Sequence, residues 1–87
     1  MLRISVIQQS EEGIRLALEG SLTDRWVNEL RRAIDDALHQ GKTLELDLAN
    51  LRYVDLDGCL LLRELSARKV NHINGSPFIQ QHIEGVL

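Results

Sequence analysis

The sequence predicts a small α/β domain, a mixed β-sheet with helices packed on it, in the order β-β-α-β-α-β-α. Short segments that alternate apolar and polar residues indicate strands, and longer segments with apolar residues at helical spacing indicate helices. A helix also separates the second and third strand segments, which predicts a parallel pair between them. The chain has 87 residues, and we expect residues 1–87 to form one domain.

The chain opens with two strand patterns. Leu2, Ile4 and Val6 alternate with polar residues, and the same period of two recurs over 14–18. The polar segment 8–13 between them ends in glycine, which predicts a hairpin and an antiparallel pair. The apolar side chains of the first strand would allow a homodimer through the sheet edge.

A long amphipathic helix is expected next, with apolar residues recurring at helical spacing over 26–38. Thr23 or Asp24 is predicted to cap its start through a side-chain oxygen. Gly41 is well placed to end it. The alternating segment 44–48 then predicts the third strand.

The second half of the chain predicts a loop over 50–57 and a second helix. This helix is expected to begin near Asp57 or Gly58 and to end at about Arg68. Its run of four apolar residues, 59–62, indicates burial over most of its surface.

A short fourth strand over 69–74 and a last helix complete the predicted order. Ser76 followed by Pro77 is typical of a helix start, because serine caps and proline is tolerated at the first helical position. The apolar stripe of this helix is expected at Phe78, Ile79, His82, Ile83 and Val86.

Composition excludes several classes of function. The net charge of -3 and the lack of a basic run argue against a nucleic-acid partner. No apolar run approaches a membrane span and the start lacks a signal-peptide pattern, so we expect a cytoplasmic protein without membrane insertion. Cys59, the only cysteine, is interpreted as a buried apolar residue. The residues offer no nucleophile–base pair, metal-ligand spacing or phosphate-binding glycine motif, so no cofactor, no metal and no enzymatic activity are expected.

The most informative segment is the turn Asp55-Leu56-Asp57-Gly58. The two carboxylates either cap the second helix and interact with its dipole or contact a partner, and capping is favoured for at least one of them. Leu56 either contacts a partner or folds back onto the core, and the sequence leaves both alternatives open. Arg63 follows on the same helix and is a candidate contact at the rim of a binding surface.

Three segments together resemble the STAS domain family of the anti-anti-sigma factors. The strand end and loop 18–22 are similar to those before the first STAS helix. The strand 44–48 followed by Val54-Asp55-Leu56-Asp57-Gly58 is similar to the family's strand and switch turn. Asn74-Gly75-Ser76-Pro77-Phe78 resembles the glycine-serine-proline that opens a late helix.

The resemblance implies a non-catalytic protein-interaction module of bacterial signalling, an anti-sigma factor antagonist. Regulatory members carry a serine or threonine after the aspartate of the turn, and a kinase-type anti-sigma factor phosphorylates it. Leu56 occupies that position here and has no hydroxyl. The implied partner-binding residues are Asp55, Leu56, Asp57, Gly58 and Arg63. Small STAS proteins also act as accessory subunits of ABC-type lipid transporters, which is the alternative function.

Overall fold

The structure, a computed structural model, describes residues 1–84 and shows the expected element order. Val86 of the expected apolar stripe lies outside these residues. The strands are β1 (Leu2–Gln9), β2 (Gly13–Leu22), β3 (Thr43–Val54) and β4 (Asn71–Ile73). The helices are α1 (Arg25–His39), α2 (Leu56–Ala67) and α3 (Pro77–Glu84).

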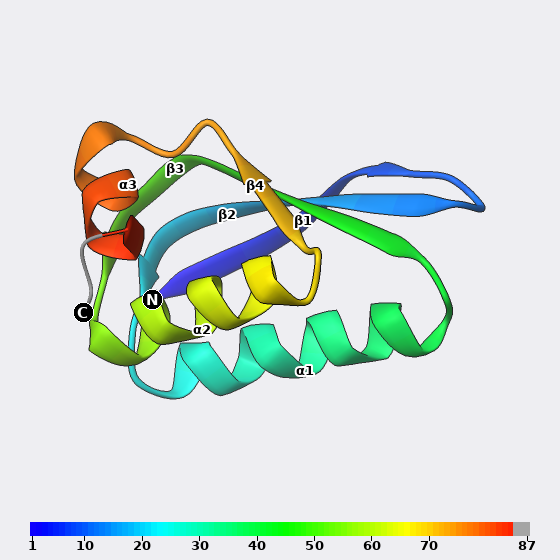
Figure 1. Cartoon of the computed structure of the whole chain (residues 1–87), viewed down its shortest axis with the longest axis horizontal. Coiled ribbons are helices and arrows are strands. Elements are labelled where there is room, and N and C mark those ends of the chain that lie inside the picture. The colour runs from blue at the N-terminus through cyan, green and yellow to red at the C-terminus, as the bar shows by residue number, and fades with distance from the viewer. Residues whose placement is uncertain (85–87) are drawn as a thin grey trace.

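The four strands form one mixed sheet in the order β1-β2-β3-β4. The pair β1/β2 is antiparallel, and the pairs β2/β3 and β3/β4 are parallel. Both the hairpin and the parallel crossover predicted from the sequence are therefore confirmed. Helices α1 and α2 run side by side beneath the sheet, and α3 lies against the last part of β3, where this strand runs down to the start of α2 (Figure 1).

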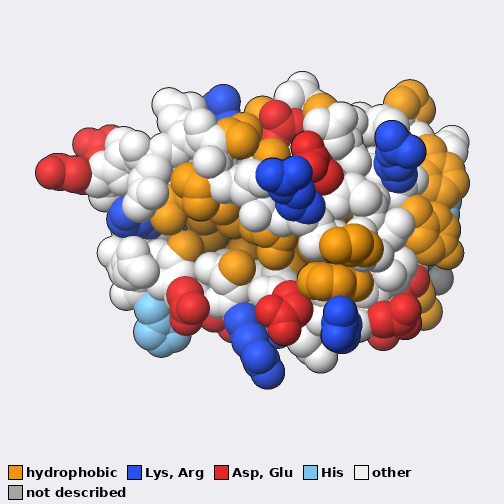
Figure 2. Space-filling model, turned by 180° about the vertical axis from the view of Figure 1, so that it is seen from behind, with side chains coloured by type: hydrophobic (Ala, Val, Ile, Leu, Met, Phe, Trp, Pro, Cys, Tyr) orange, Lys and Arg blue, Asp and Glu red, His pale blue; other side chains and the backbone are white. Residues whose placement is uncertain are grey.

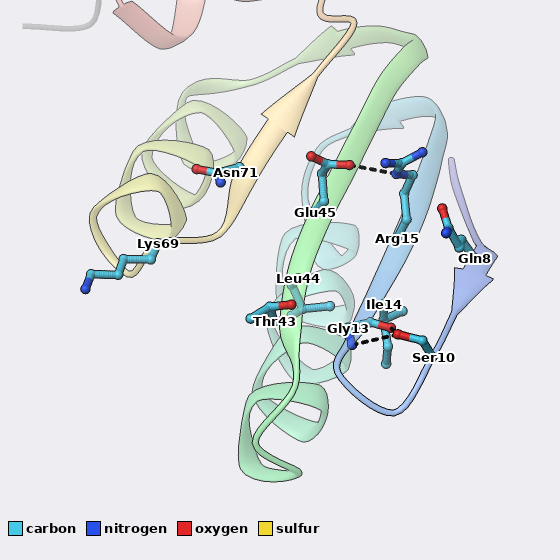
Figure 3. Close-up of a pocket in the computed structure, with 10 residues that line it drawn as sticks. All are labelled: Gln8, Ser10, Gly13, Ile14, Arg15, Thr43, Leu44, Glu45, Lys69 and Asn71. Carbon is cyan, nitrogen blue, oxygen red and sulfur yellow. Dashed lines mark hydrogen bonds and ion pairs between the residues drawn. The ribbon is translucent and has the colours of Figure 1, made fainter.

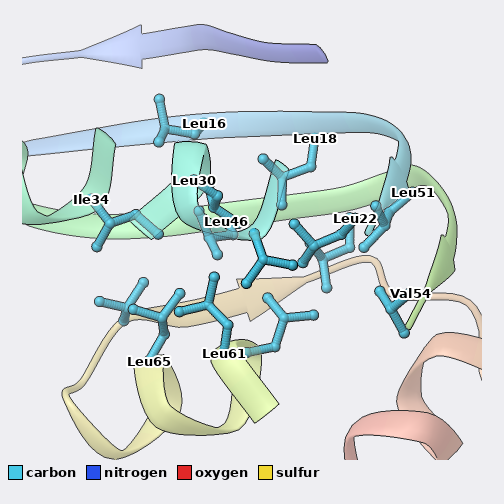
Figure 4. Packing of buried hydrophobic residues seen from close by; sticks show 14 of the residues in the cluster. Leu16, Leu18, Leu22, Leu30, Ile34, Leu46, Leu51, Val54, Leu61 and Leu65 are labelled. Atoms are coloured by element: carbon cyan, nitrogen blue, oxygen red, sulfur yellow. The ribbon is translucent and has the colours of Figure 1, made fainter. Parts of the chain in front are cut away.

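The core fills the space between the sheet and the two long helices. Leu16, Leu18 and Leu46 point from β2 and β3 toward α1 and α2 (Figure 4). Leu30 of α1 and Leu61 of α2 reach up from the helices and are 0% and 1% exposed. Aliphatic side chains from both layers thus supply the burial that stabilises the sandwich.

Strand β3 is longer than the sequence indicated. Residues 50–54, expected in a loop, continue the strand to Val54, so that prediction is wrong. The pairing of β2 with β3 shifts register twice, between Ala17 and Glu19 and between Gly20 and Ser21. Each shift places one extra residue in β3, so the alternation of side chains between the two faces of the sheet starts again after it. Leu48, Leu51 and Val54 are consequently all buried at a spacing of three, which breaks the strand pattern.

The ends of the helices are only partly as predicted. The N–H of Gly41 donates to the Leu38 carbonyl at 3.0 Å, and its φ of 75° suits a glycine after a helix, as expected. The Ile79 N–H donates to Ser76 Oγ at 3.2 Å, which confirms the cap of α3. The prediction that a side-chain oxygen caps α1 is wrong. Asp24 is the residue at the cap position, but its side chain makes no capping hydrogen bond.

Two further boundaries differ from the sequence prediction. Helix α2 begins at Leu56, one residue before the expected start at Asp57, because Asp55 caps it. Strand β4 is restricted to Asn71–Ile73, because only these residues pair with β3.

Candidate functional site

Asp55 joins two segments that are distant in the sequence. Its Oδ1 accepts a hydrogen bond from the N–H of Gly58 at 2.8 Å, which caps α2. Its Oδ2 accepts from the backbone N–H of Asp24 at 3.0 Å, in the connection between β2 and α1. Its own N–H donates to the Leu22 carbonyl at 3.2 Å. The carboxylate therefore holds the start of α2 against the β2–α1 connection.

Gly58 is required by the close packing of α2 against β2. A Cβ at this position would lie 2.5 Å from the Leu22 carbonyl oxygen and 3.1 Å from Leu22 Cγ. A backbone oxygen in a sheet cannot move aside easily, so any larger residue would displace the helix. Gly58 is buried, and with Asp55 it fixes the geometry of the turn.

The two residues between them face solvent. Leu56 is 63% exposed, so its side chain does not fold back onto the core. Asp57 is exposed in the first turn of α2, where a negative charge interacts favourably with the helix dipole. The turn thus separates into a structural pair, Asp55 and Gly58, and an accessible pair, Leu56 and Asp57.

The accessible surface continues along α2. Leu60 is 47% exposed, so the expectation that the run 59–62 is buried over most of its surface is wrong at this residue. Residues four and seven positions apart share a helix face, which places Leu56, Leu60 and the exposed Arg63 on one stripe. Leu60 was not predicted as a site residue, although its spacing of four positions from Leu56 was a signal for a shared helix face.

Other apolar side chains are exposed at the same end of the molecule. Tyr53, from the end of β3, and Phe78, from the start of α3, are both about half exposed. Figure 2 shows hydrophobic side chains gathered at this end. Exposed apolar side chains of this size can contribute to a surface that binds another protein.

Next to this stripe, α2 is joined to α1 by ion pairs. Arg31 Nη1 lies 2.5 Å from Glu64 Oε2, and Arg68 Nη2 lies 3.2 Å from Asp35 Oδ1. These pairs are partly exposed, so each stabilises the fold only modestly. Their role is to orient α2, which fixes the direction in which its exposed stripe points.

Cys59 lies within the first turns of α2 and is buried. Cys59 is 2% exposed, and burial, followed by the charge of Asp55, raises the pKa of its thiol. The thiolate needed for nucleophilic attack is therefore disfavoured. Within residues 1–84, no three His, Cys, Asp or Glu side chains are arranged to hold a metal ion.

A polar hollow of about 350 Å³ lies at the other end of the sheet (Figure 3). Two of its charged groups pair with each other, since Arg15 Nε lies 2.6 Å from Glu45 Oε1. Ser10 Oγ likewise accepts from the Gly13 N–H at 3.2 Å, within the hairpin. The hollow contains none of the candidate residues of the α2 turn.

The fold is that of a small α/β domain, with one four-stranded mixed sheet and three helices in the described residues. The profile of the family described as "Mlab, STAS domain" matches residues 5–72. The chain belongs to the STAS domain family. The resemblance noted in the sequence is thereby confirmed.

A solved structure shows the same fold. The unphosphorylated form of SpoIIAA, described as an anti-sigma factor antagonist, is similar with a TM-score of 0.71 and 24% sequence identity. The match covers 97% of this chain and 84% of the SpoIIAA chain. A search among proteins of curated function gave no match. Among residues 1–84, no helix is long and apolar enough to cross a membrane.

Proposed function

We propose that residues 1–87 form a single, non-catalytic STAS domain that binds a cytoplasmic protein partner through the accessible side of the α2 turn. The observation that carries this proposal is the 63% exposure of Leu56, held in place between the structural residues Asp55 and Gly58. When a partner covers an exposed apolar side chain, the apolar surface leaves water and the free energy of the complex is lowered.

The first candidate function is that of an anti-sigma factor antagonist in bacterial transcription control. The likeness of the fold to SpoIIAA supports it. Leu56 has no hydroxyl and cannot accept a phosphoryl group, so binding at this turn would not be switched by phosphorylation at that residue. The fixed charge of Asp57 differs from a phosphate, which carries about -1.5 to -2 charges and three acceptor oxygens. We therefore infer a constitutive antagonist, with Arg63 at the rim of the contact.

The second candidate is an accessory subunit of an ABC-type transporter assembly in the cytoplasm. The specific observation in its favour is the family profile that matches residues 5–72, which is described as "Mlab, STAS domain". A permanent subunit needs no phosphorylation switch, which agrees with a leucine at position 56. The two candidates share the same surface and differ in the class of ATP-binding partner.

Affinity capture from the native cytoplasm tests the surface and the partner together. Leu56→Ser and Asp57→Ala should each lower the recovery of the partner, while both variants stay folded because the two residues are exposed. Ile7→Ser is the matched control, since this exposed apolar residue lies near the far end of β1. Equal recovery with all three variants would exclude the turn as the binding site.

The identity of the captured protein separates the two functions. A kinase-type anti-sigma factor supports the antagonist, and an ABC-type ATP-binding protein supports the transporter subunit. Incubation of the purified pair with ATP, followed by intact mass measurement, then tests the missing switch. Stoichiometric phosphate on Ser21, Thr23 or Ser66 would contradict an unswitched protein.

A further inference from the structure

Strand β1 is an edge strand whose outer hydrogen-bonding groups can be identified. The Met1 carbonyl accepts from the Ser21 N–H at 2.8 Å, and the register continues with Arg3 opposite Glu19 and Ser5 opposite Ala17. Hydrogen-bonded and non-hydrogen-bonded pairs alternate in an antiparallel ladder. The odd-numbered residues therefore bond to β2, and the N–H and C=O groups of the even-numbered residues 2, 4 and 6 point away from β2.

The same strand borders an apolar groove between the sheet and α1. The groove has a volume of about 280 Å³. Its apolar lining is Ile4, Val6, Ile14, Leu16, Ala33 and Ala37. Figure 2 shows hydrophobic side chains gathered across the middle of this face. Val6 is 57% exposed, so an apolar row and a row of available backbone groups run along the same edge.

We propose that this edge binds a second copy of the chain, with the two β1 strands antiparallel and Ser5 on the two-fold axis. In this register Ile4 lies opposite Val6 of the partner subunit, and both belong to the set whose backbone groups point outward. The two Ile4–Val6 pairs form roughly four hydrogen bonds. Their side chains share one face of the sheet and extend the apolar groove of each copy into that of the other.

The charges near β1 favour this arrangement over a parallel one. Arg3 is the only charged residue of β1 and lies near its start, whereas Glu11 and Glu12 follow its end. Antiparallel pairing brings the cationic end of one strand toward the acidic hairpin of the other, and parallel pairing would place like charges together. The register shift after Val6 ends the regular pairing, so the expected interface is short.

The oligomeric state in solution tests this proposal, and it does so independently of the α2 turn. Light scattering across a concentration series should show a dimer for the wild type. Val6→Lys should weaken dimerisation at least about tenfold, because the ammonium group would be enclosed between apolar side chains. Leu56→Ser is the control and should dimerise normally. A wild type that remains monomeric at every concentration overturns the proposal.

A cross-linking experiment tests the register. Residues that face each other in a non-hydrogen-bonded pair have Cα atoms about 4.5 Å apart, which lies within disulfide range. Ser5→Cys should therefore form a disulfide-linked dimer under mild oxidation. Arg3→Cys, on the same strand but off the two-fold axis, should cross-link at least about tenfold more slowly. Similar rates for the two variants, or cross-linking of the wild type through buried Cys59, would contradict this register.

Discussion

The role of Asp55 as the residue that fastens α2 can be tested by comparing it with its neighbour Asp57. Asp55→Ala removes the cap to the Gly58 N–H and the bond to the Asp24 N–H. The lost cap costs about 0.5–2 kcal/mol, and the second bond, to a charged acceptor, costs about 1.5–3 kcal/mol. Because Asp55 is half-buried, water replaces part of what is lost, and we expect a total near 2–4 kcal/mol.

The conservative variant Asp55→Asn sharpens this expectation. An amide presents only one acceptor oxygen, so it can keep one of the two bonds and should lose roughly half of the stability that alanine loses. Asp57→Asn is the matched control. It removes the same charge from the same helix turn and should lower the stability by less than about 1 kcal/mol, the usual contribution of a charge to the helix dipole.

Thermal and urea unfolding followed by circular dichroism measure the three variants. At roughly 4–8 °C per kcal/mol for a domain of this size, Asp55→Ala should lower Tm by about 8–32 °C. The expected order of stability is Asp57→Asn, then Asp55→Asn, then Asp55→Ala. If Asp55→Asn unfolds at the same temperature as Asp57→Asn, the two-bond role of Asp55 is refuted.

Three further predictions follow from the same region. Gly58→Ala should lower the free energy of unfolding in urea by about 1–3 kcal/mol, because the added Cβ would lie 2.5 Å from the Leu22 carbonyl oxygen. The control is Ser66→Ala, an exposed position on the same helix, which should change it by less than about 0.5 kcal/mol. Asp24→Gly should raise Tm, because Asp24 has a φ of 51° and a ψ of −129°, a conformation that glycine adopts more readily; a lower Tm would contradict this. The buried Cys59 should react with a thiol reagent no faster than the native structure opens, and rapid labelling of the native protein would contradict this. Because the pKa of the Cys59 thiol is raised in the folded state, the thiol of the unfolded chain loses its proton at a lower pH. The free energy of unfolding should therefore fall as the pH rises past the ordinary pKa of 9.0.

Local chemistry accounts for the features that could be predicted from the sequence. The hairpin, the end of α1 at Gly41 and the start of α3 at Ser76 each depend on residues within a few positions of one another. Leu60 could not be placed in the same way, because a leucine in an apolar run looks buried until the neighbours of its helix are known. The continuation of β3 to Val54 was hidden for a related reason, since two register shifts with β2 replace the period of two by a spacing of three.

The sequence alone determined the family turn and its missing hydroxyl, because the absence of an acceptor at Leu56 is a property of that residue in any conformation. Only the tertiary structure decided what the other residues of the turn do. The partners of Asp55 and Gly58 are the Asp24 N–H and the Leu22 carbonyl, more than thirty positions earlier in the chain. Folding brings β2 against the start of α2, and that contact assigns Asp55 and Gly58 to the scaffold and leaves Leu56 and Asp57 exposed to solvent.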